Sequence, residues 1–126
     1  MNFDELVAGW VRFYQVEVQK VLEEKLDIDN EEFFWASTLV DEYCKKDPLI
    51  AMDLIDRIFA ATNDERVLAC LGAGPLEDLL VAHGELIWPA IELRASKDKR
   101  FKDLLSCVSP GRLEGSIRSK LQILIN

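Results

Sequence analysis

Apolar residues recur at every third or fourth position along almost the whole chain, with polar and charged residues between them. This spacing matches the turn of an α-helix and predicts helices in nearly every segment. The clearest case is a helix of about six turns over residues 3–22. Its expected inward-facing residues are Phe3, Leu6, Val7, Trp10, Tyr14, Val18, Val21 and Leu22.

Residues that favour helix starts divide the next part of the chain. Asn30 is a suitable N-cap, with Glu31 and Glu32 in the first turn, and predicts a second helix. Asp47 and Pro48 predict the start of a third helix, because proline fits the first helical position. The third helix is apolar around most of its circumference, so we expect it to lie centrally. The expected inward residues of the second helix are Phe34, Trp35, Leu39, Val40 and Tyr43.

Glycine and proline set the predicted boundaries further along. Asn63 or Asp64 caps a short fourth helix, which Gly72 ends by supplying a left-handed C-cap. A fifth helix starts at Gly74-Pro75 and stops near Gly84. Since Pro89 has no N–H to donate, it predicts a kink or a fresh start near Trp88.

The C-terminal third continues the helical spacing. Residues 97–108 predict another short helix, and Leu113–Ile125 a last one, although Gln122–Asn126 equally fits a short extended piece. No strand-period run or hairpin signal is present. The sequence therefore predicts a single all-α domain over residues 1–126, a compact bundle of about six or seven antiparallel helices. Residues 47–108 indicate pairing like that of helical repeats.

Size and cysteine content narrow the class of protein. A chain of 126 residues and 14.4 kDa is long enough for one domain with its own core. Three cysteines, an odd number, argue against a disulfide scaffold and predict small buried thiols. Two acids in the first ten residues do not fit a signal peptide, and no apolar run is long enough to span a membrane. We therefore expect a cytoplasmic protein.

The charge is unevenly distributed along the chain. The formal net charge is −8, but residues 1–93 carry 20 acids and 7 bases, whereas residues 94–126 carry 3 acids and 8 bases. An acidic body repels nucleic acid and anionic lipid and attracts basic partners. The basic C-terminal part either pairs with the acidic part of its own fold or binds nucleic acid through residues 94–120. Only Phe101 is aromatic within its basic cluster, so the interleaving of aromatics that stacks bases is absent, which disfavours nucleic acid.

Candidate chemistry is sparse. The single histidine, His83, and the widely spaced cysteines Cys44, Cys70 and Cys107 form no close ligand pair, so we expect no metal and no cofactor. Neither a nucleophile elbow nor a phosphate-binding loop is present. Paired carboxylates are numerous, but most are explained as first-turn acids or, for Asp53, by pairing with Arg57 one turn away.

One stretch resembles a known family. The segment LGAGPLEDLLVAHG (Leu71–Gly84), the Asp-Pro-led helix over Asp47–Ile55 and the segment Ala95–Phe101 are similar to an uncharacterised bacterial family of small acidic helical proteins. The similarity covers about residues 33–105. It implies an all-α fold and a bacterial origin, and it assigns no catalytic residue.

These features favour a binding protein over an enzyme. We expect an immunity-type inhibitor that neutralises a basic toxin or effector through an acidic surface. The alternatives are a self-associating accessory subunit, forming a homodimer through Leu121–Asn126 and the first helix, and a carboxylate-dependent hydrolase using Asp53 or Glu77. The expected partner-binding residues are Asp41, Glu42, Asp53, Asp56, Glu77, Asp78 and Glu85, with an exposed Trp35 or Trp88 as anchor.

Overall fold

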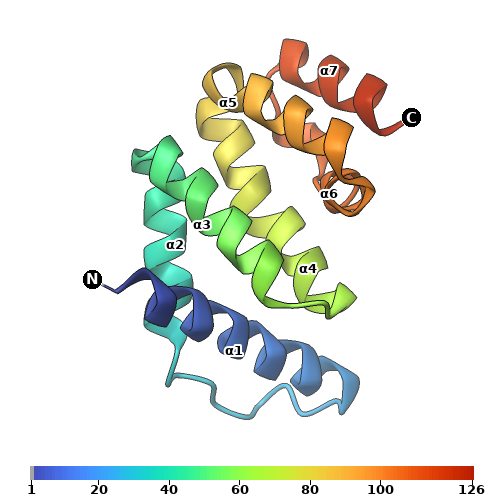
Figure 1. Ribbon diagram of the computed structural model, residues 1–126. Helices are drawn as coiled ribbons and strands as arrows, with labels where there is room; N and C mark the ends of the chain where they lie inside the picture. The colour runs from blue at the N-terminus through green and yellow to red at the C-terminus, as the bar shows by residue number, and fades with distance from the viewer. Residues whose placement is uncertain (1) are drawn as a thin grey trace.

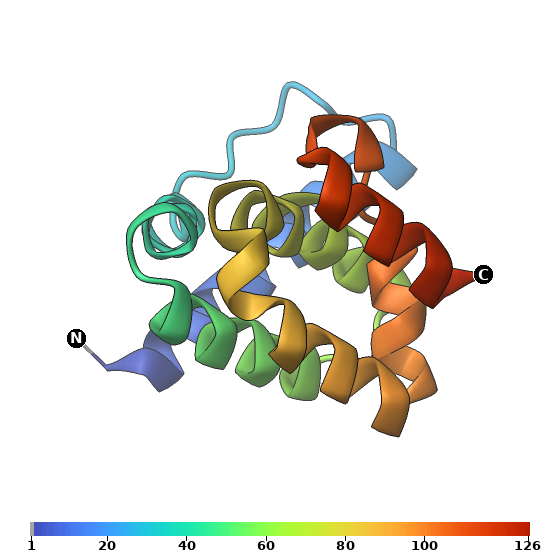
Figure 2. The ribbon, with the colours of Figure 1, turned by 90° about the horizontal axis from the view of Figure 1, so that it is seen from above.

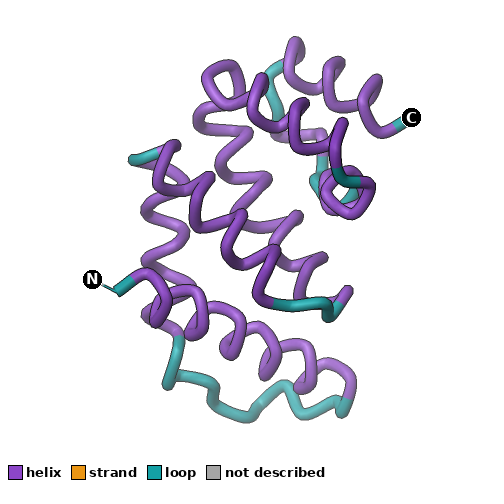
Figure 3. Tube along the Cα trace, in the orientation of Figure 1, coloured by secondary structure: helices purple, strands orange, loops and turns teal. Residues whose placement is uncertain are grey.

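The computed structural model describes residues 2–126, and every regular element in that range is helical (Figure 3). The predicted all-α fold is therefore confirmed. The α-helices are α1 (Phe3–Leu22), α2 (Phe34–Lys46), α3 (Pro48–Ala61), α4 (Glu65–Leu71), α5 (Glu77–Lys97), α6 (Lys99–Leu105) and α7 (Gly115–Ile125). A π-helical segment, η1 (Gly72–Leu76), links α4 to α5, and a 3₁₀ turn, η2 (Pro110–Arg112), precedes α7.

The helices form two groups on either side of a long central helix (Figures 1 and 2). α1, α2 and α3 pack on one another at one end, and the second half of α5 packs with α6 and α7 at the other. One continuous core joins both groups. Its largest fully buried side chains include Trp10, Leu54, Ile55, Leu71, Leu76, Leu79, Phe101 and Leu105.

Several helix starts follow the predicted capping chemistry. The Asp47 carboxylate accepts a hydrogen bond from the Ile50 N–H, and that of Asp64 accepts one from the Arg66 N–H at 3.0 Å. Asn30 was expected to cap α2, but α2 begins only at Phe34 and has no side-chain cap. The Asn30 amide instead donates to the Phe13 carbonyl of α1 at 3.0 Å, which fixes the preceding loop against α1.

Gly72 follows the last residue of α4 as its C-cap, as predicted, but it does not adopt the predicted left-handed conformation. Its φ of −67° and ψ of −46° are right-handed, and the helix continues through η1 into α5. The π turn accommodates Pro75, which has no N–H to donate. Glycine is required at position 72 for space, because a Cβ there would lie 2.6 Å from the Leu104 carbonyl oxygen.

The central helix bends at His83, where φ is −139° and ψ is 27°. A kink therefore lies next to Gly84, where a stop was expected, but the helix continues to Lys97. The kink or fresh start expected near Trp88 is absent, and Pro89 lies within regular helix. Contacts on both sides hold the bend. His83 Nε2 donates to the Lys45 carbonyl at the end of α2, 2.8 Å away, and a Cβ on Gly84 would lie 2.9 Å from Ile117 of α7.

The inward face of α2 and the burial of the cysteines differ from the expectations, and the open alternative for the C-terminal segment is decided. The inward face of α2 is Ala36, Ser37, Val40 and Cys44, so that Phe34 and Trp35 are exposed. Leu113–Ile125 contains a helix that extends to Ile125, which decides against an extended C-terminal piece. Of the three cysteines only Cys44 is buried; Cys70 is half-buried and Cys107 is exposed.

One helix meets the length and composition of a membrane span, contrary to the expectation of none. It is the continuous helix Glu65–Lys97, of 33 residues. Half of its most apolar window is buried inside the fold, as is common for the core helix of a globular protein.

The Gly72 contact predicts opposite effects of the same substitution at two glycines. Gly72→Ala should lower the free energy of unfolding by about 1–3 kcal/mol, because the new methyl group must displace the α6 backbone. Gly115→Ala in α7, where nothing beyond the chain neighbours lies within 4 Å of the added Cβ, should raise it by up to about 1 kcal/mol through helix propensity. Urea unfolding monitored by circular dichroism measures both, and equal effects would contradict the packing argument.

Candidate functional site

The carboxylates of α3 that were expected on a partner surface are paired within the fold. Arg94 binds Asp56 through two hydrogen bonds, of 2.8 Å from Nε and 2.6 Å from Nη2. This pair raises the pKa of the Arg94 guanidinium. Arg57 Nε binds Asp53 at 3.0 Å, as the spacing of the two residues predicts. Both acids are therefore largely neutralised by neighbouring cations.

The same holds on α5. Glu77 and Asp78 share Arg112, at 2.9 and 3.1 Å, and Glu85 lies 3.8 Å from Lys120. With the Arg94 pair, these contacts show that the basic C-terminal part pairs with the acidic part of its own fold, which was one of the two predicted alternatives. On α2, Glu42 lies 3.5 Å from Lys46.

Burial removes two expected residues from any surface that a partner can reach. Glu77 is only 5 % exposed, and its carboxylate also accepts the Ser109 N–H at 2.7 Å. It thus fixes the connection between α6 and α7 to the central helix. Trp88 is likewise 5 % exposed, whereas Trp35 is 42 % exposed. Of the two tryptophans considered as anchors, only Trp35 is accessible.

Asp41 is the one member of the expected set without an ion pair within residues 2–126. It lies at the contact of α2 with α5. Burial, and secondarily the carboxylate of Asp78, raise the pKa of Asp41, while Lys45 opposes this shift. The same burial raises the pKa of the neighbouring Cys44 thiol to about 12, so this thiol stays protonated at neutral pH.

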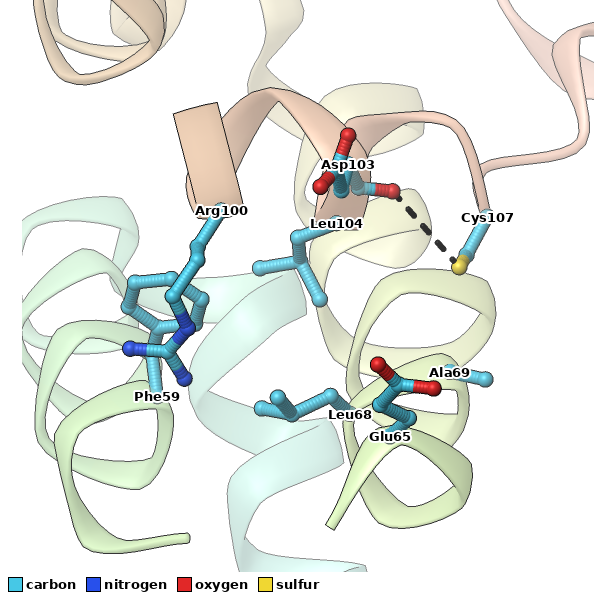
Figure 4. A pocket seen from close by; sticks show the side chains of 8 residues that line it. All are labelled: Phe59, Glu65, Leu68, Ala69, Arg100, Asp103, Leu104 and Cys107. Carbon is cyan, nitrogen blue, oxygen red and sulfur yellow. Dashed lines mark hydrogen bonds between the residues drawn. The ribbon is translucent and has the colours of Figure 1, made fainter. Parts of the chain in front are cut away.

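A small pocket lies between α3, α4 and α6 (Figure 4). Its volume is about 300 Å³. The Arg100 guanidinium covers the Phe59 ring at 4.7 Å and donates to Asn63 at 3.3 Å, so it is already engaged. Burial raises the pKa of the Cys107 thiol at the rim, which disfavours its nucleophilic form. No group of three or more His, Cys, Asp or Glu residues within the described chain is arranged to hold a metal ion.

A larger groove lies along the second half of α1, and the sequence analysis did not identify it. Its volume is about 700 Å³. Burial in this region raises the pKa of Tyr14 and of the Cys70 thiol. The groove is lined by Phe13, Tyr14, Glu17, Val18, Val21 and Leu22 of α1, Asn30 of the following loop, Phe34 of α2, and Arg66 and Cys70 of α4.

The loop beside this groove carries a cluster of unpaired acids. It covers residues 23–33, and we call it the acidic loop; Figure 1 shows it running back along α1. Within residues 2–126, five of its six carboxylates have no cation within 4 Å, and all five are exposed. They belong to Glu24, Asp27, Asp29, Glu31 and Glu32.

The start of the acidic loop shows a further departure from the usual pattern. α1 ends in a Schellman motif, with the Lys25 N–H donating to Lys20 at 2.8 Å and the Glu24 N–H to Val21 at 3.2 Å. Glu24 occupies the left-handed position, with a φ of 57°, where glycine is usual. A charged residue therefore stands where backbone strain favours glycine.

The alternation of acids with Leu26, Ile28 and Phe33 was the available signal for this site. It was interpreted as a turn followed by first-turn acids of a helix, because Asn30 resembled an N-cap. With α2 starting at Phe34, Glu31 and Glu32 lie before the helix, in the exposed loop.

Together, fold and groove define a small all-α protein with an apolar groove, to which the acidic loop contributes Asn30. A protein-family model described as "Family of unknown function (DUF6869)" matches residues 23–125 of the sequence. The chain therefore belongs to this family. No curated protein and no solved structure matches the chain.

The buried Glu77 carboxylate predicts a large stability effect. Glu77→Ala should lower the free energy of unfolding by about 2–3 kcal/mol, because it leaves the Ser109 N–H without its acceptor. Glu77→Gln retains an acceptor oxygen, so its free energy of unfolding should fall clearly less than that of Glu77→Ala. Urea unfolding of both variants tests this, and similar losses would assign the effect to charge alone.

Removing the Asp41 carboxylate should stabilise the protein, in contrast to removing that of Glu77, and this effect should depend on pH. Since the pKa of Asp41 is raised in the folded state, ionisation destabilises the protein as the pH rises through that pKa. Asp41→Asn should therefore increase the melting temperature at pH 7, and this gain should shrink towards pH 3.5. Thermal melts at several pH values measure it, and a gain that is constant across this range would contradict the assignment.

Proposed function

We propose that this chain is a protein-binding module that captures a basic partner, and that it acts as an immunity-type inhibitor of a basic toxin in the bacterial cytoplasm. The observation that carries the proposal is the acidic loop. Its five unpaired carboxylates are exposed on one connection, while most other expected acids are matched by cations of the same chain.

Internal pairing determines which acids attract a partner. A carboxylate that is paired with an arginine of the same chain contributes little to the net electrostatic field. Exposed ion pairs also contribute little energy, so exchanging one for a pair with a partner gains little. Unpaired carboxylates on one short segment add their fields over a Debye length of about 8 Å at physiological salt. The acidic loop is therefore the part of the body that accelerates association with a basic surface.

Trp35 fits the role of the aromatic anchor. It lies two residues after the acidic loop, at the start of α2, and it is accessible. Binding energy in protein interfaces concentrates in such aromatic residues, surrounded by polar rims. Free thiols on the described chain agree with action in a reducing cytoplasm.

The test uses the basic product of a neighbouring gene, expressed alone and with this chain. We expect growth arrest by that product alone, rescue by co-expression, and binding whose association rate falls as salt is added. In the loop variant, Glu24→Gln, Asp27→Asn, Asp29→Asn and Glu32→Gln together, the association rate should fall about tenfold or more, because steering charges are lost.

A control variant with the same change in net charge isolates the loop. It combines Glu5→Gln, Glu65→Gln, Glu92→Gln and Asp103→Asn, which are unpaired acids on other elements. Its association rate with the partner should lie within about threefold of that of the parent chain. Equal losses in both variants, or the absence of rescue by the parent chain, would overturn the proposal.

A further inference from the structure

We infer that the groove along the second half of α1 docks an amphipathic basic helix of the partner, with its apolar face in the groove and its lysines or arginines against the acidic loop. This inference rests on the proposed function and assigns it a place and a ligand chemistry.

The apolar face of α1 continues beyond its own core. The buried residues of α1 end at Phe13. The same face continues through Tyr14 and Val18, which are half-buried, to Val21 and Leu22, which are 63 % and 51 % exposed. A helix normally buries its whole apolar stripe, so the second half of this stripe lacks a covering element within the described chain.

The exposed apolar residues of the protein are concentrated in the segment that ends α1, forms the acidic loop and begins α2, and Val21, Leu22 and Phe34 of this segment line the groove. Six of the eleven large exposed apolar side chains lie between residues 21 and 35. Concentrated exposed apolar surface with a polar rim is typical of protein interaction sites. These six are Val21, Leu22, Leu26, Ile28, Phe34 and Trp35.

Geometry favours a helix as the occupant. The α1 residues that line the groove run from Phe13 to Leu22, a length of about 15 Å at the rise of an α-helix. That length matches about three turns of a bound helix, which would present side chains at helical spacing to the groove. Residues 2–126 contain no strand, so no sheet edge is available there for an added strand.

Charge identifies the chemistry of that helix. Arg66 is the one cation lining the groove, and the nearby Lys20 and Lys25 are held by Glu17 and Glu23, each at 3.3 Å. The five unpaired carboxylates of the acidic loop outnumber Arg66. A helix with lysines or arginines flanking its apolar face complements the negative charge of the acidic loop.

The same charges disfavour two other occupants. A second copy docked by two-fold symmetry would place one acidic loop against the other, because such an interface uses the same patch on both subunits. An anionic membrane surface would be repelled by the carboxylates of the acidic loop. A partner with a basic amphipathic helix satisfies both the apolar and the charged parts of the site.

The first experiment measures binding of a 14-residue Leu/Lys peptide, with leucines at helical spacing on one face, by titration calorimetry. One control peptide carries glutamate in place of lysine. A second control peptide has the same residues as the Leu/Lys peptide in strictly alternating order. We expect the Leu/Lys helix to bind at least about tenfold more tightly than either control, because only it matches both charge and period.

A second measurement locates the peptide. In a Cys107→Ser background, Cys70 is the reactive thiol of the groove, since Cys44 is buried and its pKa is raised to about 12. The peptide should slow alkylation of Cys70 by iodoacetamide at pH 8.5. Unchanged alkylation under saturating peptide would overturn the assignment of the groove.

Matched variants separate the groove from general surface hydrophobicity. The groove variant combines Val21→Ser, Leu22→Ser and Phe34→Ser, all at exposed positions. The control variant combines Leu86→Ser, Leu93→Ser and Ile123→Ser, which are exposed on α5 and α7. The groove variant should weaken binding of peptide and partner at least about tenfold, and the control less than about threefold.

The outcomes distinguish this inference from the proposed function. If the loop variant loses the partner while the groove variant retains it, the inference fails and the proposed function stands. If neither variant affects the partner, both fail. Tighter binding to zwitterionic vesicles than to the peptide, or a dimer that the groove variant abolishes in light scattering, would also overturn the inference.

Discussion

Both halves of the fold depend on the packing of one bent helix. From Glu65 to Lys97 the backbone continues through a π turn and bends at His83, and each irregularity is held by another element. Gly72 admits the carbonyl of Leu104 at the π turn, and His83 donates to the Lys45 carbonyl at the bend. A straight, regular helix could not contact α2 and α7 with these same residues. The two helix groups are therefore oriented by contacts at positions where the helix is irregular.

The ionic pairing of the chain follows from this arrangement. The bend brings the end of α5 to α3 and its beginning to the segment before α7, so that Arg94 meets Asp56 and Arg112 meets Glu77. Three of the eight cations of the C-terminal part, Arg94, Arg112 and Lys120, are thereby paired with acids of the same molecule. The acidic loop lies outside their reach, and its carboxylates remain available. The surface charge that a partner meets is thus a consequence of the fold and differs from the charge distribution along the sequence.

Helix positions could be predicted from the sequence because they depend on local periodicity and capping. The start of α3 at Asp47-Pro48 and the extent of α1 are of this kind. Gly72 was misinterpreted because glycine serves two purposes, a left-handed cap and a close approach, and only the position of Leu104 distinguishes them. The burial of Glu77 likewise depends on Ser109, 32 residues away. The groove could not be predicted, because the spacing of Val18 and Val21 is the same whether the fold covers them or not.

The two components of the proposed site come from different parts of the chain. The acidic loop and Phe34 lie within residues 23–125, the region matched by the family model, whereas one wall of the groove belongs to α1, before that region. α1 packs against both α2 and α3, which attaches this wall to the family region. Under the proposed function, charge in the loop would govern how fast a basic partner arrives, and the apolar wall would govern how long it stays. A change in the α1 face between Tyr14 and Leu22 would therefore alter which partner is retained while leaving electrostatic attraction intact.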